Sequence, residues 1–94
     1  ETDFTIWSIP MKTHDLKIRP EFFAPVRQGV KTAEIRLNDR NFQVGDLLEL
    51  NEWNAGHFTG AFVVREITHV ADISEFKPGY VLLSMIPFEI AEVA

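Results

Sequence analysis

The stretch Gly29-Val30-Lys31-Thr32-Ala33-Glu34-Ile35-Arg36-Leu37-Asn38-Asp39-Arg40 contains the most informative pattern in this 94-residue chain. Polar and apolar residues alternate strictly between Thr32 and Leu37, which is typical of a β-strand with one face in the core. The two rows are Ala33, Ile35 and Leu37 on one side, and Thr32, Glu34 and Arg36 on the other. We therefore expect the apolar row to face the core and the polar row to lie on the opposite face.

Ionisable side chains are concentrated in this strand and in the turn that follows it. They are Lys31, Glu34, Arg36, Asp39 and Arg40. Glu34 and Arg36 lie about 7 Å apart along a strand, close enough to pair with each other or to bind one small ligand. Charged side chains on the wall of a small barrel are costly unless they form ion pairs or bind a ligand. Two interpretations follow: a structural network of ion pairs, or a polar ligand pocket.

In the pocket interpretation each residue has a distinct role. Glu34 accepts hydrogen bonds from a base or an amine, Arg36 contacts a phosphate or carbonyl group, and Lys31 contacts phosphate or acts as a general base. Other candidate residues complete the site. Thr32 shares the polar face, and Asp39 and Arg40 close one side. Trp53 and Tyr80 stack on the ligand or cap it.

The composition is that of one globular domain with a single core, because 46% of the residues are hydrophobic and 24% are charged. The chain has no cysteine, which excludes disulfides, thiolate metal sites and a cysteine nucleophile, and fits a reducing cytoplasm. The histidines, His14, His57 and His69, lack the spacing of metal ligands. We expect a cytoplasmic monomer with no metal, no cofactor, no signal peptide and no membrane span.

The net charge of −5 argues against a protein that binds polyanions over its whole surface, but the charges are unevenly distributed. Residues 12–40 hold seven basic and four acidic side chains, whereas residues 41–94 hold two basic and eight acidic ones. The first part of the chain can therefore form a small positive cleft in an acidic body. Such a cleft suits one nucleotide or a short single strand better than a long duplex.

Short strands separated by turn residues dominate the chain, with one helix near its start. Strands are expected over residues 11–18, 31–36, 47–53, 58–70 and 80–86, with a bend at Gly60. The helix should begin near Pro20 and end at Gly29, with a kink or a late start because Pro25 lacks an amide hydrogen. This order predicts an α+β, mainly β fold: a mixed barrel of five to six strands with one short helix beside its mouth.

Gly29-x-Lys31-x-x-Glu34-x-Arg36 resembles the G-x-K-x-x-E-x-R signature of the ASCH domains, relatives of the PUA-like RNA-binding barrels. The surrounding sequence is similar to a small bacterial and phage branch of that superfamily, of unassigned function. The segments that carry this similarity are His14-x-Leu16-Lys17, Pro20-Glu21-Phe22-Phe23, Asn38-Asp39-Arg40-x-Phe42-x-Val44-Gly45-Asp46-x-Leu48, Glu52-Trp53 and Gly79-Tyr80-Val81-x-Leu83. The likeness covers residues 11–86; residues 1–10 and 87–94 are expected to be an N-terminal extension and a C-terminal tail.

The resemblance implies a PUA-like β-barrel whose cleft is lined by the signature residues. ASCH domains have been proposed to bind RNA. Some small members resemble this chain in size and act as amidohydrolases on acylated cytidine nucleosides, with a lysine as base and a threonine as nucleophile. By position the lysine corresponds to Lys31, whereas Glu34 takes the place of the threonine, and a carboxylate can activate water. Ribonuclease activity has also been suggested within the superfamily.

The sequence is therefore compatible with three functions. The leading hypothesis is an RNA- or nucleotide-binding domain whose pocket, built from Lys31, Glu34 and Arg36, accepts an unmodified or modified nucleoside. The second is a small metal-independent hydrolase in which Lys31 and Glu34 are catalytic. The third is a barrel that binds a protein partner.

Overall fold

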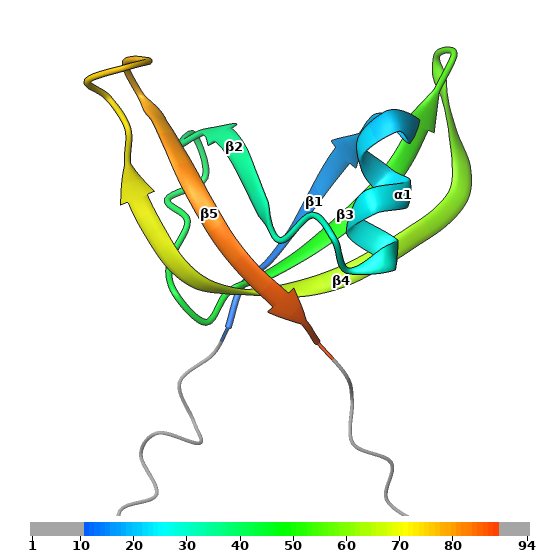
Figure 1. Ribbon diagram of the computed structural model, residues 1–94, viewed down its shortest axis with the longest axis horizontal. Coiled ribbons are helices and arrows are strands. Elements are labelled where there is room, and N and C mark those ends of the chain that lie inside the picture. The colour runs from blue at the N-terminus through cyan, green and yellow to red at the C-terminus, as the bar shows by residue number, and fades with distance from the viewer. Residues whose placement is uncertain (1–10, 89–94) are drawn as a thin grey trace, which may run out of the picture.

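The computed structural model describes residues 11–88, which form a five-stranded mixed sheet curled into a half-barrel with one short helix (Figure 1). The elements, in chain order, are β1 (Thr13–Ile18), α1 (Pro20–Gln28), β2 (Ala33–Leu37), β3 (Leu47–Asn54), β4 (His57–Asp72) and β5 (Tyr80–Pro87). This confirms the predicted mainly β fold. The expected N-terminal extension and residues 89–94 of the expected tail lie outside the described residues.

The sheet owes its curvature to the long strand β4. The strand order is β1-β3-β4-β5-β2, with β1 parallel to β3 and all other pairs antiparallel. The first half of β4 pairs with β3 and the second half with β5, so β4 runs through both walls of the half-barrel (Figure 1). A bulge interrupts the β3–β4 register where Gly60 was predicted to bend the strand. Strands β1 and β2 are left as the two edges of the sheet.

Helix α1 begins and ends at the predicted residues. Pro20 is its first residue, and Gly29 ends it in the left-handed conformation with φ of 85°, which glycine adopts without steric cost. Phe23 and Val26 are fully buried and attach the helix to the sheet. The helix continues through Pro25, so the alternative of a late start was wrong.

The core lies on the inner face of the curled sheet and beneath α1. It consists of Leu16, Ile18, Phe23, Val26, Phe42, Leu48, Leu50, Ile67, Val81, Leu83 and Met85. No helix within residues 11–88 is long and apolar enough to cross a membrane.

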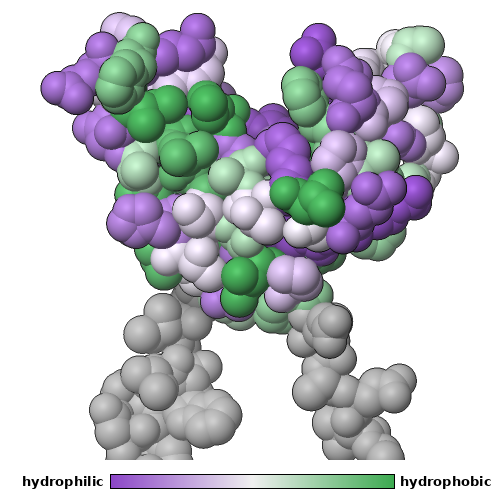
Figure 2. All heavy atoms as spheres, in the orientation of Figure 1, coloured by the Kyte–Doolittle hydropathy of each residue, from purple (hydrophilic) through white to green (hydrophobic). Residues whose placement is uncertain are grey.

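Strand β2 turns the opposite way from the sequence prediction. Ile35 and Leu37 are 58% and 47% exposed, whereas Glu34 is only 6% exposed, so the apolar row faces outward. The register explains this, because Glu34 is paired with the fully buried Leu83, and paired residues share one face of a sheet. Figure 2 shows hydrophobic surface on the wall that contains β2 and β5. The prediction that the apolar row faces the core was wrong.

A buried carboxylate fixes the loop between β2 and β3. Asp46 accepts hydrogen bonds from Nε2 of His14 at 2.8 Å, from the backbone amide of Gln43 at 3.1 Å and from that of Lys12 at 3.4 Å. Burial acts to raise the pKa of Asp46, but these hydrogen bonds outweigh it and hold the pKa below its ordinary value. Asp46 therefore ties the start of β1 to the loop that leads into β3.

This depressed pKa predicts acid sensitivity. A carboxylate whose pKa is lower in the folded state contributes stability above its unfolded pKa of 3.8, and loses it as the pH falls through the folded value. The free energy of unfolding in urea should therefore fall as the pH drops below 3.8. Asp46→Asn should cost about 1–3 kcal/mol at neutral pH and should flatten this fall, because the titrating group is gone. Equal pH dependence in the two proteins would contradict the role given to Asp46.

Candidate functional site

Glu34 lies at the centre of a three-residue charge cluster on the inner face of β2. Its Oε2 is 2.6 Å from Nζ of Lys31, and its Oε1 accepts hydrogen bonds from Nη2 and Nε of Arg36 at 2.9 and 3.1 Å. The Lys31 ammonium also donates to the carbonyl of Ala33. The Glu34 side chain is 7% exposed, whereas those of Lys31 and Arg36 are 29% and 22% exposed. The carboxylate is thus at the bottom of the site and the cations reach toward solvent.

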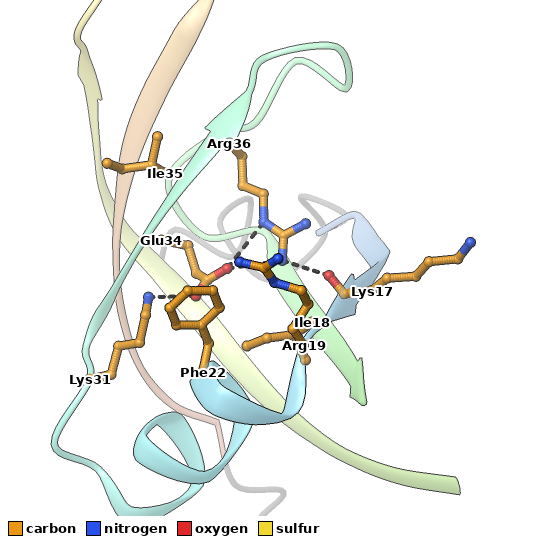
Figure 3. A pocket seen from close by; sticks show the side chains of 8 residues that line it. All are labelled: Lys17, Ile18, Arg19, Phe22, Lys31, Glu34, Ile35 and Arg36. Atoms are coloured by element: carbon orange, nitrogen blue, oxygen red, sulfur yellow. Dashed lines mark hydrogen bonds and ion pairs between the residues drawn. The ribbon is translucent and has the colours of Figure 1, made fainter. Parts of the chain in front are cut away.

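The cluster forms one wall of a pocket of about 440 Å³ (Figure 3). The lining residues come from the end of β1, the start of α1, strand β2 and the connections before and after α1: Lys17, Ile18, Arg19, Phe22, Lys31, Glu34, Ile35 and Arg36. Figure 3 shows the Phe22 ring beside the Lys31–Glu34 pair, and the Ile35 side chain pointing to the other side of β2. Figure 2 shows the molecule hollowed between its two walls.

Arg36 joins the two edge strands of the sheet at this pocket. Besides Glu34, its guanidinium donates a hydrogen bond of 2.9 Å to the backbone carbonyl of Lys17, at the end of β1. Strands β1 and β2 are at opposite ends of the strand order and share no ladder. The pocket therefore lies in the open seam of the half-barrel, and Arg36 spans that seam.

Positive charge dominates the pocket. Arg19, Lys31 and Arg36 are cationic and Glu34 is acidic, which gives a formal balance of +2 in a chain of net charge −5; Lys17 reaches the pocket with its backbone, and its side chain extends away (Figure 3). Arg19 also forms an exposed ion pair with Glu21 at 3.3 Å. The Phe22 ring is 40% exposed and lies 5.3 Å from Cζ of Arg19 and 5.8 Å from Nζ of Lys31. An anionic ligand with an apolar plane would match these groups.

The structure brings together Lys31, Glu34 and Arg36 but not the other residues predicted for the site. Thr32 is exposed and does not line the pocket. Asp39 and Arg40 form an exposed ion pair with each other at 3.8 Å, in the loop after β2. Strand β2 ends at Leu37, and the turn that follows it lies outside the lining of this pocket.

The two predicted aromatic residues also lie outside the lining. Tyr80 lines a second, more polar cavity of about 500 Å³ beside the loop after β2, where Nζ of Lys77 lies 4.6 Å from its ring centroid. Trp53 lies at the end of β3, with Nζ of Lys17 4.0 Å from its ring centroid. Trp53 therefore contacts Lys17, a residue of the lining, without lining the pocket itself.

Sequence reasoning missed the half of the pocket that β1 and α1 supply. Neither Lys17 nor Phe22 is among the residues that the sequence predicted for the site. The sequence Arg19-Pro20 is the signal that could have identified this half. It starts the helix directly after β1 and so places Phe22 over the end of that strand. Within residues 11–88, no group of three or more histidine, aspartate or glutamate side chains is arranged to hold a metal ion.

Two comparisons with known proteins extend over this whole site. A family model described as "Domain of unknown function (DUF3850)" matches residues 13–85. A protein of Escherichia phage P2, described as "Uncharacterized 12.9 kDa protein in GpA 3'region", is 46% identical over 79 residues, which are 84% of this chain and 72% of that protein. The family match begins at the first residue of β1 and ends within β5, so it includes every residue that lines the pocket.

Proposed function

We propose that this chain, which belongs to the DUF3850 family, binds a nucleotide or a short single strand of RNA in the pocket around Glu34. A curled mixed sheet with one helix beside its mouth is compatible with the ASCH and PUA-like barrels that the Gly29–Arg36 signature resembles. The proposal concerns binding. Of the described residues that line the pocket, none carries a hydroxyl or thiol group that would serve as a nucleophile.

The observation that carries the proposal is a buried carboxylate framed by cations in an otherwise apolar pocket. Oε1 of Glu34 accepts two hydrogen bonds from Arg36, whereas Oε2 accepts one from Lys31, so Oε2 keeps acceptor capacity for an amino group of a base. The cations themselves keep exposed surface, so a phosphate can reach them. The site thus presents an acceptor for a base and donors for a phosphate within one pocket.

Phe22 and the volume of the pocket support the same ligand class. The exposed ring is a flat apolar surface at the mouth, and aromatic rings of this kind stack on bases of unpaired nucleotides. A pocket of about 440 Å³ is within the range of small-molecule sites. The sign of the charge also argues for an anion, because the lining is positive while the chain as a whole is negative.

An NMR titration of the isotopically labelled chain tests the proposal directly. The four nucleoside 5′-monophosphates and short single-stranded RNAs would be added at low and at moderate salt. We expect chemical-shift changes at Phe22, Lys31, Glu34 and Arg36, with an affinity that falls as salt rises because the phosphate contacts are screened. Shift changes confined to residues outside the pocket, or none with any of these ligands, would contradict the proposal.

A further inference from the structure

A second group of side chains lies where the end of β1 meets the hairpin formed by β3 and β4. It consists of Lys17, Trp53 and Phe58, which we call the hairpin cluster. The Trp53 and Phe58 rings meet edge to face, with centroids 4.7 Å apart and an interplanar angle of 79°. The ammonium of Lys17 is 4.0 Å from the Trp53 centroid and 5.9 Å from that of Phe58.

Lys17 links this cluster to the pocket. Its backbone carbonyl accepts the hydrogen bond from Arg36, whereas its side chain extends away from the pocket (Figure 3). Among residues 11–88, no carboxylate forms an ion pair with Lys17. A cation without an acidic partner, adjacent to a positive pocket, is suited to a phosphate that follows the one bound in the pocket.

The aromatic members of the cluster are accessible. Phe58 is 54% exposed and Trp53 is half-buried, at the point where the register between β3 and β4 shifts. Single exposed apolar side chains are common on protein surfaces, but the Phe58 ring differs in lying edge to face against Trp53 and near the ammonium of Lys17, which together offer a stacking surface beside a cation. Bases of single strands stack on such rings in a sequence-tolerant way.

The charges nearby define the direction in which a strand would run. Asp15 lies opposite Glu49 in the β1–β3 register, and Asp15 shares a face with Lys17 because it is two residues away along β1. These two carboxylates would repel a phosphate backbone that ran back along β1. A strand leaving the pocket would therefore cross the end of β1 and continue onto the hairpin.

We propose that the hairpin cluster is a subsite for a second nucleotide, and that the domain binds a single strand of nucleic acid rather than an isolated nucleotide. This inference rests on the function proposed for the pocket. Lys17 contacts the phosphate that joins the two nucleotides, and Phe58, supported by Trp53, stacks on the second base.

Affinities for ligands of different length test this inference. Dissociation constants of nucleoside monophosphates, tetrauridylate and tetraadenylate would be measured for the full chain by calorimetry or NMR. Because stacking contributes about 1–3 kcal/mol per base, the tetranucleotides should bind at least about fivefold more tightly than the matching monophosphates. Lys17→Gln and Phe58→Ala should each remove most of this advantage, and Phe58→Ala, which lies outside the pocket lining, should leave the affinity for monophosphates within about twofold of wild type.

Matched controls are available on the opposite wall. Lys77 is stacked over Tyr80 as Lys17 is over Trp53, and Phe76 is 83% exposed, so Lys77→Gln and Phe76→Ala remove the same groups elsewhere. Both control variants should retain the advantage of the tetranucleotide. Thermal unfolding of all four variants checks that the hairpin remains folded.

The outcomes separate the two proposals. Equal affinity for monophosphates and tetranucleotides, or an unchanged advantage in both Lys17→Gln and Phe58→Ala, overturns the second subsite and leaves the pocket standing. Tetranucleotide binding that is lost in these variants but survives Glu34→Ala supports the subsite and overturns the pocket. Failure of every nucleic-acid ligand to bind overturns both, and would favour a protein partner for the exposed rings.

Discussion

Glu34→Ala is expected to weaken nucleotide binding by about 10- to 150-fold, which corresponds to the loss of one hydrogen bond to a charged group, about 1.5–3 kcal/mol. Two effects oppose each other. Removing a negative charge favours an anionic ligand, but Lys31 and Arg36 are held in place by this carboxylate at 2.6 and 2.9 Å. Without it the two cations repel each other and turn toward solvent, so the pocket loses its acceptor and the orientation of its donors. We expect the loss of this arrangement to outweigh the removal of the negative charge, so that the nucleotide binds more weakly.

The stability of the same variant distinguishes a ligand site from a structural network of ion pairs. Lys31 and Arg36 side chains remain partly exposed, so they can be hydrated after the substitution, and Glu34→Ala should cost only about 1–3 kcal/mol. Glu34→Gln keeps the shape and one acceptor, and should retain more affinity than the alanine variant. Unchanged nucleotide affinity together with a loss of 3 kcal/mol or more, as for a fully buried pair, would identify a structural network.

The local sequence signals predicted the elements well because each has a local physical cause. Pro20 and Gly29 mark the ends of α1 by their own backbone preferences, and the alternation in β1 agrees with its burial, since Leu16 and Ile18 are in the core. The hairpin between β3 and β4 turns at Ala55 and Gly56, both with positive φ, within the segment of turn residues. These features depend on residues that are close together in the sequence.

The orientation of β2 could not be predicted in this way, because it depends on tertiary structure. Alternation shows that a strand has two different faces, but it does not show which one is inside. Here the inner face at the edge of the sheet is a pocket, so Glu34 is inside and Ile35 is outside. The contribution of Lys17 and Phe22 to the pocket has the same origin, since it arises where the two ends of the strand order approach each other.

Phe23→Ala is expected to destabilise the fold more than any change in the pocket, by about 3–5 kcal/mol, because a large buried ring is replaced by a cavity. Phe23 is 2% exposed and is among the largest fully buried side chains of the described residues. Small domains have about 5–15 kcal/mol of stability in total, so the melting temperature should fall by at least about 12 °C. Thermal unfolding followed by circular dichroism measures this effect.

Phe22→Ala is the matched control, because it removes the same ring from the adjacent position on the same helix. The Phe22 ring is 40% exposed and lines the pocket, so its removal should change the free energy of unfolding by no more than about 0.5 kcal/mol. Nucleotide affinity should nevertheless fall about 5- to 150-fold if the ring stacks on a base. A Phe22→Ala variant that melts early, or that binds nucleotides as wild type does, would assign this ring to the packing of α1 rather than to the ligand site. The two variants therefore separate the packing of α1 from its part in the ligand site. Under conditions where both variants are folded, Phe23→Ala should lower only the free energy of unfolding, and Phe22→Ala should lower only the affinity for nucleotides.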